Sequence, residues 1–480
     1  MSELKQLAVE LAQIVGDYHV LSSDVDLSLY ESDAETLDRA KPDLVVLPGS
    51  TEELSEVLKL ANRYKVPFTP RGAGTGLSGG ATAIMGGISI AMTRMNRVLK
   101  IDPEERMAHV QVGVPNLSVS KAAEAFGLYF APDPSSQVAS TIGGNLAENA
   151  GGAHCLKYGM TTSHVLGVKF VLPNGDVTTL GGAFRDSLSL DLLGVLVGSE
   201  GTLGIATEAY LRLTPRVEGV QTLLAYFDSL ESGGEAVSEI IAAGIIPAAM
   251  EMIDRLSFGC VEESWHLGLN LDAGALLIVE LDGPPAIIKM QRENVERIIS
   301  AKGSIETKWA ADEKERALIW KARKSAFAAL GRLAPHAYVL DGVIPRSKLK
   351  EAIVSIDLIG KKYGVIVSNI YHAGDGNLHP ALLYDRSKEE EVKNVLIASR
   401  EILELCVHLG GTLSGEHGIG IEKLLEMPVA FTDSDLEAMA RLKRSFNPLD
   451  LCNPGKLIPS PKSCGESGRR PLLRYQIIAC

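Results

Sequence analysis

The segment 372–379, with the sequence HAGDGNLH, carries the side chains that say most about chemistry. The flanking segments 365–371 and 378–384 are predicted strands, and Asp375-Gly376 is typical of a type I′ hairpin turn. With those two residues at the turn, His372 and His379 face each other directly, where opposed Cβ atoms lie roughly 5 Å apart. Two imidazoles at that separation can bind one metal ion.

A third ligand is available in the segment 415–418, where Glu416 and His417 lie between two glycines. Two histidines and one carboxylate with an open position suit Zn²⁺, Mn²⁺ or Fe²⁺. We therefore predict a divalent-metal site at His372, His379 and Glu416. The alternative is structural, because a histidine in a strand is more often a hydrogen-bonded core residue than a ligand, and an Asp-Gly hairpin requires no chemistry.

A second kind of site is indicated by glycine. The segment 70–80, PRGAGTGLSGG, contains a formal GxGxxG pattern, but the residues after it favour a strand, whereas a Rossmann fingerprint must open a helix. Successive glycines still leave backbone N–H groups free to converge on a phosphate, and Arg71 and Thr75 add donors. The alternative is an ordinary tight glycine turn.

Further segments of the same composition follow at 132–136 (PDPSS), 140–145 (STIGGN), 149–152 (NAGG) and 198–204 (GSEGTLG). Glycine is costly in regular structure, so this recurrence predicts several backbone segments that close around one large flat ligand.

These glycine-rich segments resemble the FAD domain of the vanillyl-alcohol oxidase/p-cresol methylhydroxylase superfamily. The resemblance implies that the first loop holds the pyrophosphate, the next two line the ribityl chain and isoalloxazine, and the last ones hold the adenine half. The implied cofactor-binding residues are Arg71, Gly72, Ala73, Gly74, Thr75, Gly76, Leu77, Ser78, Pro132, Asp133, Ser135, Thr141, Gly143, Gly144, Asn145, Gly151, Gly152, Glu200, Gly201, Ile205 and Asn453. The first loop has no histidine for a covalent flavin link, which favours non-covalent FAD. Cys155 is a second candidate for such a link, but we interpret it as a buried structural cysteine.

The second half of the chain has a resemblance of its own. It is similar to the C-terminal domain of FAD-linked oxidases that act on D-2-hydroxy acids, on the motifs HAGDGNLHP, SGEHGIG and CNPGK. That group includes D-lactate dehydrogenases, D-2-hydroxyglutarate dehydrogenases and glycolate oxidase subunits. The glycolate oxidase subunits are the members most similar to segments 319–327, 331–335 and 340–346. The hydroxyglutarate enzymes carry a lysine near position 340 and a polar residue two after the second histidine. Leu340 and Ala381 stand there instead, which favours a smaller monocarboxylate.

The resemblance implies an FAD-dependent dehydrogenase that oxidises glycolate or D-lactate to the 2-oxo acid. We expect His417 to act as the general base and Arg323 to pair with the substrate carboxylate, unless Arg323 is a helix-surface residue. The six scattered cysteines form no CxxC pair, so electrons must pass to an external acceptor: an iron–sulfur subunit, an electron-transferring flavoprotein or a quinone. Alternatives are a catalytically silent flavin-bearing subunit, a D-2-hydroxyglutarate dehydrogenase, and a non-redox member of the superfamily.

The elements that must position these residues form an α+β fold in 480 residues with 46% hydrophobic content. We expect an N-terminal helical segment (1–40), a two-part FAD-binding domain (41–216), a substrate and metal domain with an antiparallel sheet and C-terminal helices (217–459), and a loose tail (460–480). The net charge of −13 argues against nucleic acid as a main partner. No targeting segment or membrane span is expected, which favours a cytoplasmic protein; docking to a membrane complex and a homodimer remain open.

Overall fold

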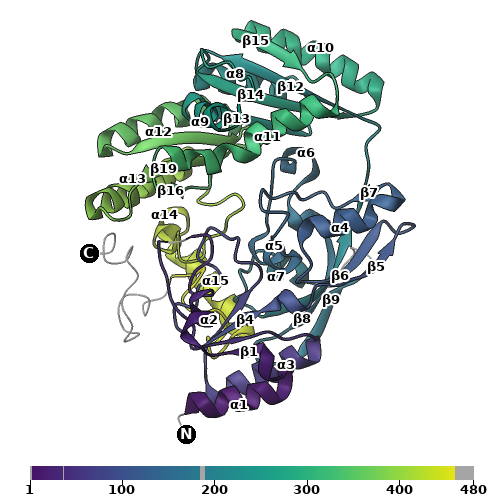
Figure 1. The fold of residues 1–480 in the computed structure, drawn as a ribbon, viewed down its shortest axis with the longest axis vertical. Coiled ribbons are helices and arrows are strands. Elements are labelled where there is room, and N and C mark those ends of the chain that lie inside the picture. Colours follow the sequence, from purple (N-terminus) through teal and green to yellow (C-terminus); the bar gives the residue numbers. More distant parts are fainter. Residues whose placement is uncertain (1–2, 36, 184–189, 460–480) are drawn as a thin grey trace. The chain divides into compact units, whose positions relative to one another are not determined.

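The computed structural model describes residues 3–35, 37–183 and 190–459, coloured along the sequence in Figure 1. The chain divides into two compact units. Unit 1 consists of residues 1–151, 160–216 and 416–480, and unit 2 of residues 152–159 and 217–415. Both units combine helices with β-sheets, which confirms the expected α+β fold. The expected loose tail, 460–480, lies outside the described residues.

The units differ from the expected domains in three segments. The N-terminal helix is part of unit 1, because Leu7, Leu11 and Val15 lie in its core. Residues 152–159 group with unit 2, where His154 contacts Glu280. The segment from residue 416 onward, which we expected to belong to the C-terminal domain, returns to unit 1.

Unit 1 contains two main sheets. The four-stranded sheet has the order β1-β2-β4-β3, with β4 parallel to both β2 and β3, and the five-stranded sheet is antiparallel in the order β5-β6-β10-β8-β9. A short pair, β7 with β11, completes them. The strands are β1 (Val20–Leu21), β2 (Leu44–Val46), β3 (Phe68–Arg71), β4 (Ile88–Ala91), β5 (Val98–Asp102), β6 (Met107–Gln111), β7 (Leu128–Tyr129), β8 (Val165–Val171), β9 (Val177–Gly181), β10 (Ile205–Arg212) and β11 (Thr214–Pro215).

The helices of unit 1 follow their capping residues. Ser50 accepts a hydrogen bond from the Glu53 amide at the start of α3, and Thr432 forms a capping box with Asp435 at the start of α15. The helices are α1 (Glu3–Val15), α2 (Asp24–Ser28), α3 (Thr51–Tyr64), α4 (Asn116–Ala123), α5 (Ile142–Glu148), α7 (Leu192–Leu196), α14 (Met427–Ala430) and α15 (Asp433–Phe446).

Unit 2 is built on one eight-stranded sheet with the order β15-β12-β14-β13-β18-β19-β16, with β17 also paired to β19. Its strands are β12 (Gly219–Phe227), β13 (Ala249–Asp254), β14 (Ala275–Gly283), β15 (Ser304–Trp309), β16 (His336–Val339), β17 (Gly342–Val343), β18 (Ile366–His372) and β19 (Asn377–Tyr384). Its helices are α6 (Cys155–Tyr158), α8 (Leu230–Ala242), α9 (Arg255–Trp265), α10 (Pro285–Ala301), α11 (Glu313–Ala329), α12 (Leu349–Tyr363) and α13 (Glu389–His408).

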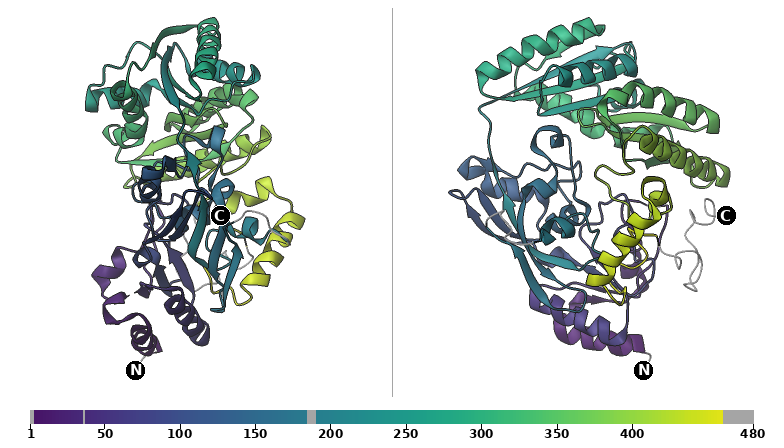
Figure 2. Two further views of the ribbon diagram at one scale, coloured as in Figure 1. Left: turned by 90° about the vertical axis from the view of Figure 1, so that its right-hand side faces the viewer. Right: turned by 180° about the vertical axis from the view of Figure 1, so that it is seen from behind.

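One face of this sheet is apolar along part of its strands and carries ionisable side chains beyond that part. Side chains of alternate residues share a face, so Ile253, Leu276 and Ile370 pack with α9 and α11 in the core of unit 2. On the same face, Glu251 and His372 continue β13 and β18 beyond that apolar region. The other face packs against α8, where Gly233 lies beside Met252 and Phe227. Helices therefore cover both faces of the sheet (Figures 1 and 2).

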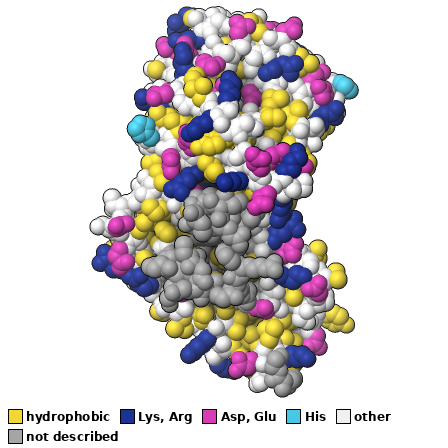
Figure 3. Space-filling view, turned by 90° about the vertical axis from the view of Figure 1, so that its left-hand side faces the viewer, with side chains coloured by type: hydrophobic (Ala, Val, Ile, Leu, Met, Phe, Trp, Pro, Cys, Tyr) yellow, Lys and Arg dark blue, Asp and Glu magenta, His cyan; other side chains and the backbone are white. Residues whose placement is uncertain are grey.

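Charged side chains of both signs are interspersed on the face drawn in Figure 3. Lysine and arginine side chains alternate there with aspartate and glutamate, and neither sign gathers into one broad patch. Among the described residues, no helix has both the length and the apolar character that crossing a membrane requires.

Candidate functional site

The two hairpin histidines lie close together, but in a register that differs from the expected one. His372 pairs with Asn377 and Ile370 pairs with His379, because residues 373–376 form a four-residue turn in place of the expected two-residue turn. The shift is by two residues, so both histidines remain on one face of the sheet. Their rings meet edge to face with centroids 5.0 Å apart. The direct opposition that we predicted is wrong, whereas the proximity is confirmed.

Each histidine ring is oriented through its Nδ1 atom. His372 Nδ1 lies 2.7 Å from Glu251 Oε1, and His379 Nδ1 lies 3.0 Å from the carbonyl oxygen of Leu340. A carboxylate or carbonyl on one ring nitrogen is the usual way in which proteins orient a histidine so that its other nitrogen can bind a metal. Nε2 is therefore the atom of each ring that suits a ligand role.

Glu251, which the sequence analysis missed, lies directly across the sheet from His372 and is fully buried. Burial alone would raise the pKa of its carboxyl group, but the interactions with His372 and Arg323 outweigh it and hold the pKa below the usual value. The carboxylate is therefore ionised at neutral pH. The acidic residue inside the otherwise apolar run 248–253 was the sequence feature that could have identified it.

Arg323 is buried on α11 and is not the helix-surface residue that we weighed as the alternative, since only 4% of it is exposed. Its Nε atom donates to Glu251 Oε2 at 2.5 Å. Its guanidinium also lies over the ring of Phe327, one turn further along α11, and that ring packs edge to face with His379. Arg323 and the histidine pair thus belong to one packed cluster.

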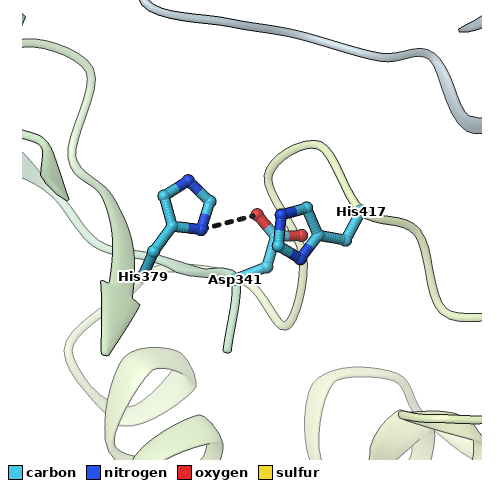
Figure 4. Close-up of side chains that lie close together, drawn as sticks. All are labelled: Asp341, His379 and His417. Atoms are coloured by element: carbon cyan, nitrogen blue, oxygen red, sulfur yellow. Dashed lines mark ion pairs between the residues drawn. The ribbon is translucent and has the colours of Figure 1, made fainter. Parts of the chain in front are cut away.

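Asp341 is a further residue that the sequence analysis missed. Its Oδ1 atom lies 4.0 Å from His379 Nδ1, as Figure 4 shows, and its Oδ2 atom accepts hydrogen bonds from Ser414 Oγ and from the amide of Gly415. The segment that leads into Glu416 and His417 is therefore attached to the sheet that carries the hairpin. Glu416 and His417 belong to unit 1, and Glu416 Oε1 lies 3.9 Å from His417 Nε2.

The glycine loops of unit 1 contact one another closely. A Cβ atom on Gly72 would lie 2.3 Å from Thr141 Oγ1, and one on Gly74 would lie 2.2 Å from the guanidinium of Arg71. Arg71 ends β3 and donates to the carbonyl oxygen of Ser32. Thr141 caps α5 by accepting from the Gly144 amide. Residues 71–78 and 141–145, predicted to hold the same cofactor, are thus neighbours.

Polar atoms in these loops fit a bound cofactor. Within the described part of the chain, Ser78 Oγ, Ser140 Oγ and Asn145 Nδ2 are buried without a hydrogen-bond partner. Buried polar atoms are almost always hydrogen-bonded in folded proteins, so these three require a partner that the polypeptide does not provide. Ser78 and Asn145 are residues for which the family resemblance implied FAD contact.

Other predicted cofactor residues have side chains that are engaged within the protein. Glu200 accepts from the amides of Ile419 and Gly420, and Asn453 donates to the carbonyl oxygens of Gly80 and Glu200. Their side chains therefore connect the C-terminal segment to the glycine loops. Among the remaining predicted residues, Gly143 lies in α5, Ile205 begins β10 and Gly152 belongs to unit 2. The others lie in loops of unit 1; they are Ala73, Thr75, Gly76, Leu77, Pro132, Asp133, Ser135, Gly151 and Gly201. Cys155, expected to be buried, is half-exposed.

The core of unit 1 beneath the first loop contains ionisable groups. Lys456 donates to the carbonyl oxygen of Gly80, and burial lowers its pKa to about 7. Burial, with the nearby carboxylates of Glu200 and Asp33, raises the pKa of Glu148 well above its usual range. The surroundings of Glu148 therefore favour its neutral form over the carboxylate.

Both halves of the chain match families of known proteins. A family model described as the C-terminal domain of FAD linked oxidases matches residues 216–457, and one described as an FAD binding domain matches residues 42–181. The chain is 43% identical over 458 residues to glycolate oxidase subunit GlcD of Escherichia coli strain K12, covering 95% of this chain and 92% of that protein.

Two further relatives and two solved structures extend the comparison. GlcD of Bacillus subtilis strain 168 is 39% identical, covering 94% of this chain and 97% of that protein, and the mitochondrial D-lactate dehydrogenase [cytochrome] of Arabidopsis thaliana is 32% identical, covering 88% and 74%. 4-Ethylphenol oxidase from Gulosibacter chungangensis and p-cresol methylhydroxylase each align with a TM-score of 0.79, covering 95% of this chain and 97% of theirs, at 20% and 17% identity. The structural likeness shows the fold.

Proposed function

Because this chain belongs to the FAD-linked oxidases, we propose that the 2-hydroxy acid it oxidises is a small monocarboxylate, glycolate or D-lactate. The observation that carries this proposal is the buried cluster of His372, His379, Glu251 and Arg323 in unit 2. A buried arginine with free terminal nitrogen atoms suits a carboxylate. Leu340 and Ala381, both fully buried and apolar, offer nothing to a second carboxylate.

We further propose that a divalent metal binds to His372, His379 and Glu416, one of two donor groups suited to an ion among the described residues; the other combines Asp341, His379 and His417. Two observations support the first group: the Nδ1 atoms of both hairpin histidines are already engaged, and Gly415, the residue before Glu416, is held by Asp341. A divalent metal at such a site polarises a hydroxyl group and lowers its pKa.

The chain's own residues then have separate tasks. Arg323 would bind the substrate carboxylate through its Nη atoms, since its Nε atom is engaged with Glu251. His417 would accept the proton of the α-hydroxyl group on a ring nitrogen. FAD, when bound, takes up the hydride that leaves the α-carbon.

We also propose that the electrons leave through partner subunits or another external acceptor. Two of the relatives are named as subunits of glycolate oxidase, which supports an assembly. The four cysteines of the described ranges form no disulfide and lie in separate segments of the chain, unlike the grouped cysteines that hold an iron–sulfur cluster.

An anaerobic titration tests the proposal. The purified protein is mixed with glycolate, D-lactate, L-lactate or D-2-hydroxyglutarate, and the flavin absorbance is followed before and after treatment with a chelator. We expect glycolate or D-lactate to bleach the flavin, D-2-hydroxyglutarate to fail, and chelation to stop the bleaching until Zn²⁺, Mn²⁺ or Fe²⁺ is restored. A flavin that none of these acids bleaches would contradict the proposed substrate, and bleaching that survives complete metal removal would contradict the metal.

A further inference from the structure

The carboxylate of Glu251 is shared between two residues to which the proposed function gives different tasks. Oε1 lies 2.7 Å from His372 Nδ1, and Oε2 lies 2.5 Å from Arg323 Nε. All three side chains are buried: 0% of Glu251, 5% of His372 and 4% of Arg323 is exposed. One buried group therefore contacts both a proposed metal ligand and the proposed carboxylate-binding arginine.

This arrangement determines which ring nitrogen of His372 carries the proton. A carboxylate only accepts hydrogen bonds, so His372 must carry its proton on Nδ1, and the lone pair is then on Nε2. The same carboxylate holds the guanidinium at Nε, so the Nη atoms are oriented by it. Neither effect requires Glu251 to touch substrate or metal.

We propose that Glu251 is a positioning residue that couples metal binding to substrate binding, by keeping the Nε2 lone pair of His372 available and by fixing Arg323. This inference rests on the proposed function, because it takes His372 as a metal ligand and Arg323 as the carboxylate partner. It adds a residue that contacts neither the metal nor the substrate.

The isosteric substitution Glu251→Gln tests whether Glu251 serves both His372 and Arg323. Glutamine has one acceptor oxygen and an NH₂ group, so it cannot accept from both the His372 Nδ1–H and the Arg323 Nε–H. Whichever donor faces the NH₂ group loses its acceptor. If that donor is His372, its Nδ1 atom can accept from the NH₂ group only after the ring proton has moved to Nε2. We expect Zn²⁺ affinity to fall about 10- to 100-fold, the range typical for partners of metal-binding histidines, and the KM for the substrate to rise.

A pair of double variants keeps the test sharp if Glu251→Gln alone does not fold. In Glu251→Gln/Arg323→Met the competing donor is absent, so the glutamine oxygen can serve His372; in Glu251→Met/Arg323→Met no acceptor remains. Neither double variant leaves a charge of this pair buried and unpaired. We expect the first to recover most of the Zn²⁺ affinity and the second to bind Zn²⁺ more weakly, with a raised KM in both.

Glu280 provides a matched control. It is also a buried carboxylate of a central strand that contacts an arginine, Arg316, and a histidine, His154, but His154 is no proposed ligand. Glu280→Gln should lower the thermal stability and leave Zn²⁺ affinity unchanged.

The measurement is competition for Zn²⁺ between the FAD-loaded, metal-stripped protein and a fluorescent chelator, with melting curves recorded for each variant. Lower affinity in Glu251→Gln, recovery in the Gln/Met double variant and no recovery in the Met/Met double variant would support the proposal. Equal Zn²⁺ affinity in the two double variants would overturn it. A wild-type protein that binds no Zn²⁺, Mn²⁺ or Fe²⁺ would instead refute the proposed metal site itself, before any variant is compared.

Discussion

At the scale of single residues, His417 is the proposed general base, a role that no other histidine of the chain should be able to perform. A general base contributes about 10²–10⁴-fold to the rate of its step. We expect His417→Ala to slow anaerobic flavin bleaching by a factor in that range, while FAD content and melting temperature stay close to those of the wild type. Stopped-flow absorbance with glycolate or D-lactate measures the rate.

The matched control for this substitution is His109→Ala. His109 lies on β6 in unit 1, stacked on Tyr210 and paired with Glu208, and it has no task in the proposed reaction. It should bleach its flavin at the wild-type rate. A His417→Ala protein that is as fast as the His109→Ala protein would show that another group accepts the proton.

The same scale shows what the sequence can and cannot reveal about the site. His372, His379 and Arg323 could be identified because each residue type has a limited set of chemical roles and the flanking pattern is specific. Glu251 and Asp341 could not, because their importance depends on which neighbours the sheet brings to them: Glu251 faces His372 across β13 and β18, about 120 positions away in sequence. An acidic residue within an apolar strand indicates a buried partner but does not name it.

At the scale of elements, the loop after β3 depends on the space that Gly74 leaves for Arg71. Gly74 has φ +73°, and a Cβ atom there would lie 2.2 Å from the guanidinium. Gly74→Ala should therefore displace Arg71 and weaken FAD binding about 10-fold or more, in addition to the roughly 1–2 kcal/mol that a left-handed alanine costs. Flavin fluorescence during dilution or dialysis measures the affinity.

Gly127→Ala is the control, since Gly127 has φ +66° and no heavy atom within 4 Å of the added Cβ. The two substitutions carry a similar backbone cost, so only the displacement of Arg71 distinguishes them. If both proteins retain FAD equally well, Arg71 does not contribute to the cofactor site in the way we propose.

Element predictions from the sequence succeeded where a local pattern is sufficient. The helices 51–64 and 433–446 begin at such local signals, because Ser50 and Thr432 supply caps at their N-termini. The 372–379 hairpin shows the limit: alternation fixed which residues share a face, but the pairing depends on turn length, and a four-residue turn moved the partner of His372 from His379 to Asn377.

At the scale of the whole molecule, the order of elements along the chain does not determine the composition of the units. The segment after Gly415 returns to unit 1, where Asn453 and Lys456 bind the carbonyl oxygen of Gly80. Nothing in its local pattern distinguishes such a return from a continuation of the second domain. Long-range hydrogen bonds of this kind are set by tertiary packing, which single-sequence patterns do not encode.

The buried carboxyl groups of the two units should respond to acid with opposite signs. In unit 1, burial raises the pKa of Asp33 to about 6 and raises those of Glu148 and Glu200, so these three carboxyl groups bind protons more readily in the folded unit than in the unfolded chain. In unit 2, burial alone would raise the pKa of Glu280, but His154 and Arg316 hold it well below the usual value. The raised pKa of Asp254 offsets part of that effect.

Linkage then gives the direction of each change. A raised folded pKa means that stability increases as the pH falls through about 6, whereas a lowered one means that stability is present above the unfolded value near 4.5 and is lost below it.

Each unit has its own hydrophobic core, so calorimetry with FAD in excess should resolve two transitions. Between pH 7 and pH 5 the unit 1 transition should move up while that of unit 2 stays in place; between pH 5 and pH 4 the unit 2 transition should move down. Glu280→Gln should lower the unit 2 transition and flatten its acid dependence, which identifies it. Two transitions that shift in parallel from pH 7 to pH 5 would contradict the opposite signs, because groups titrating alike in both units would then dominate the acid response.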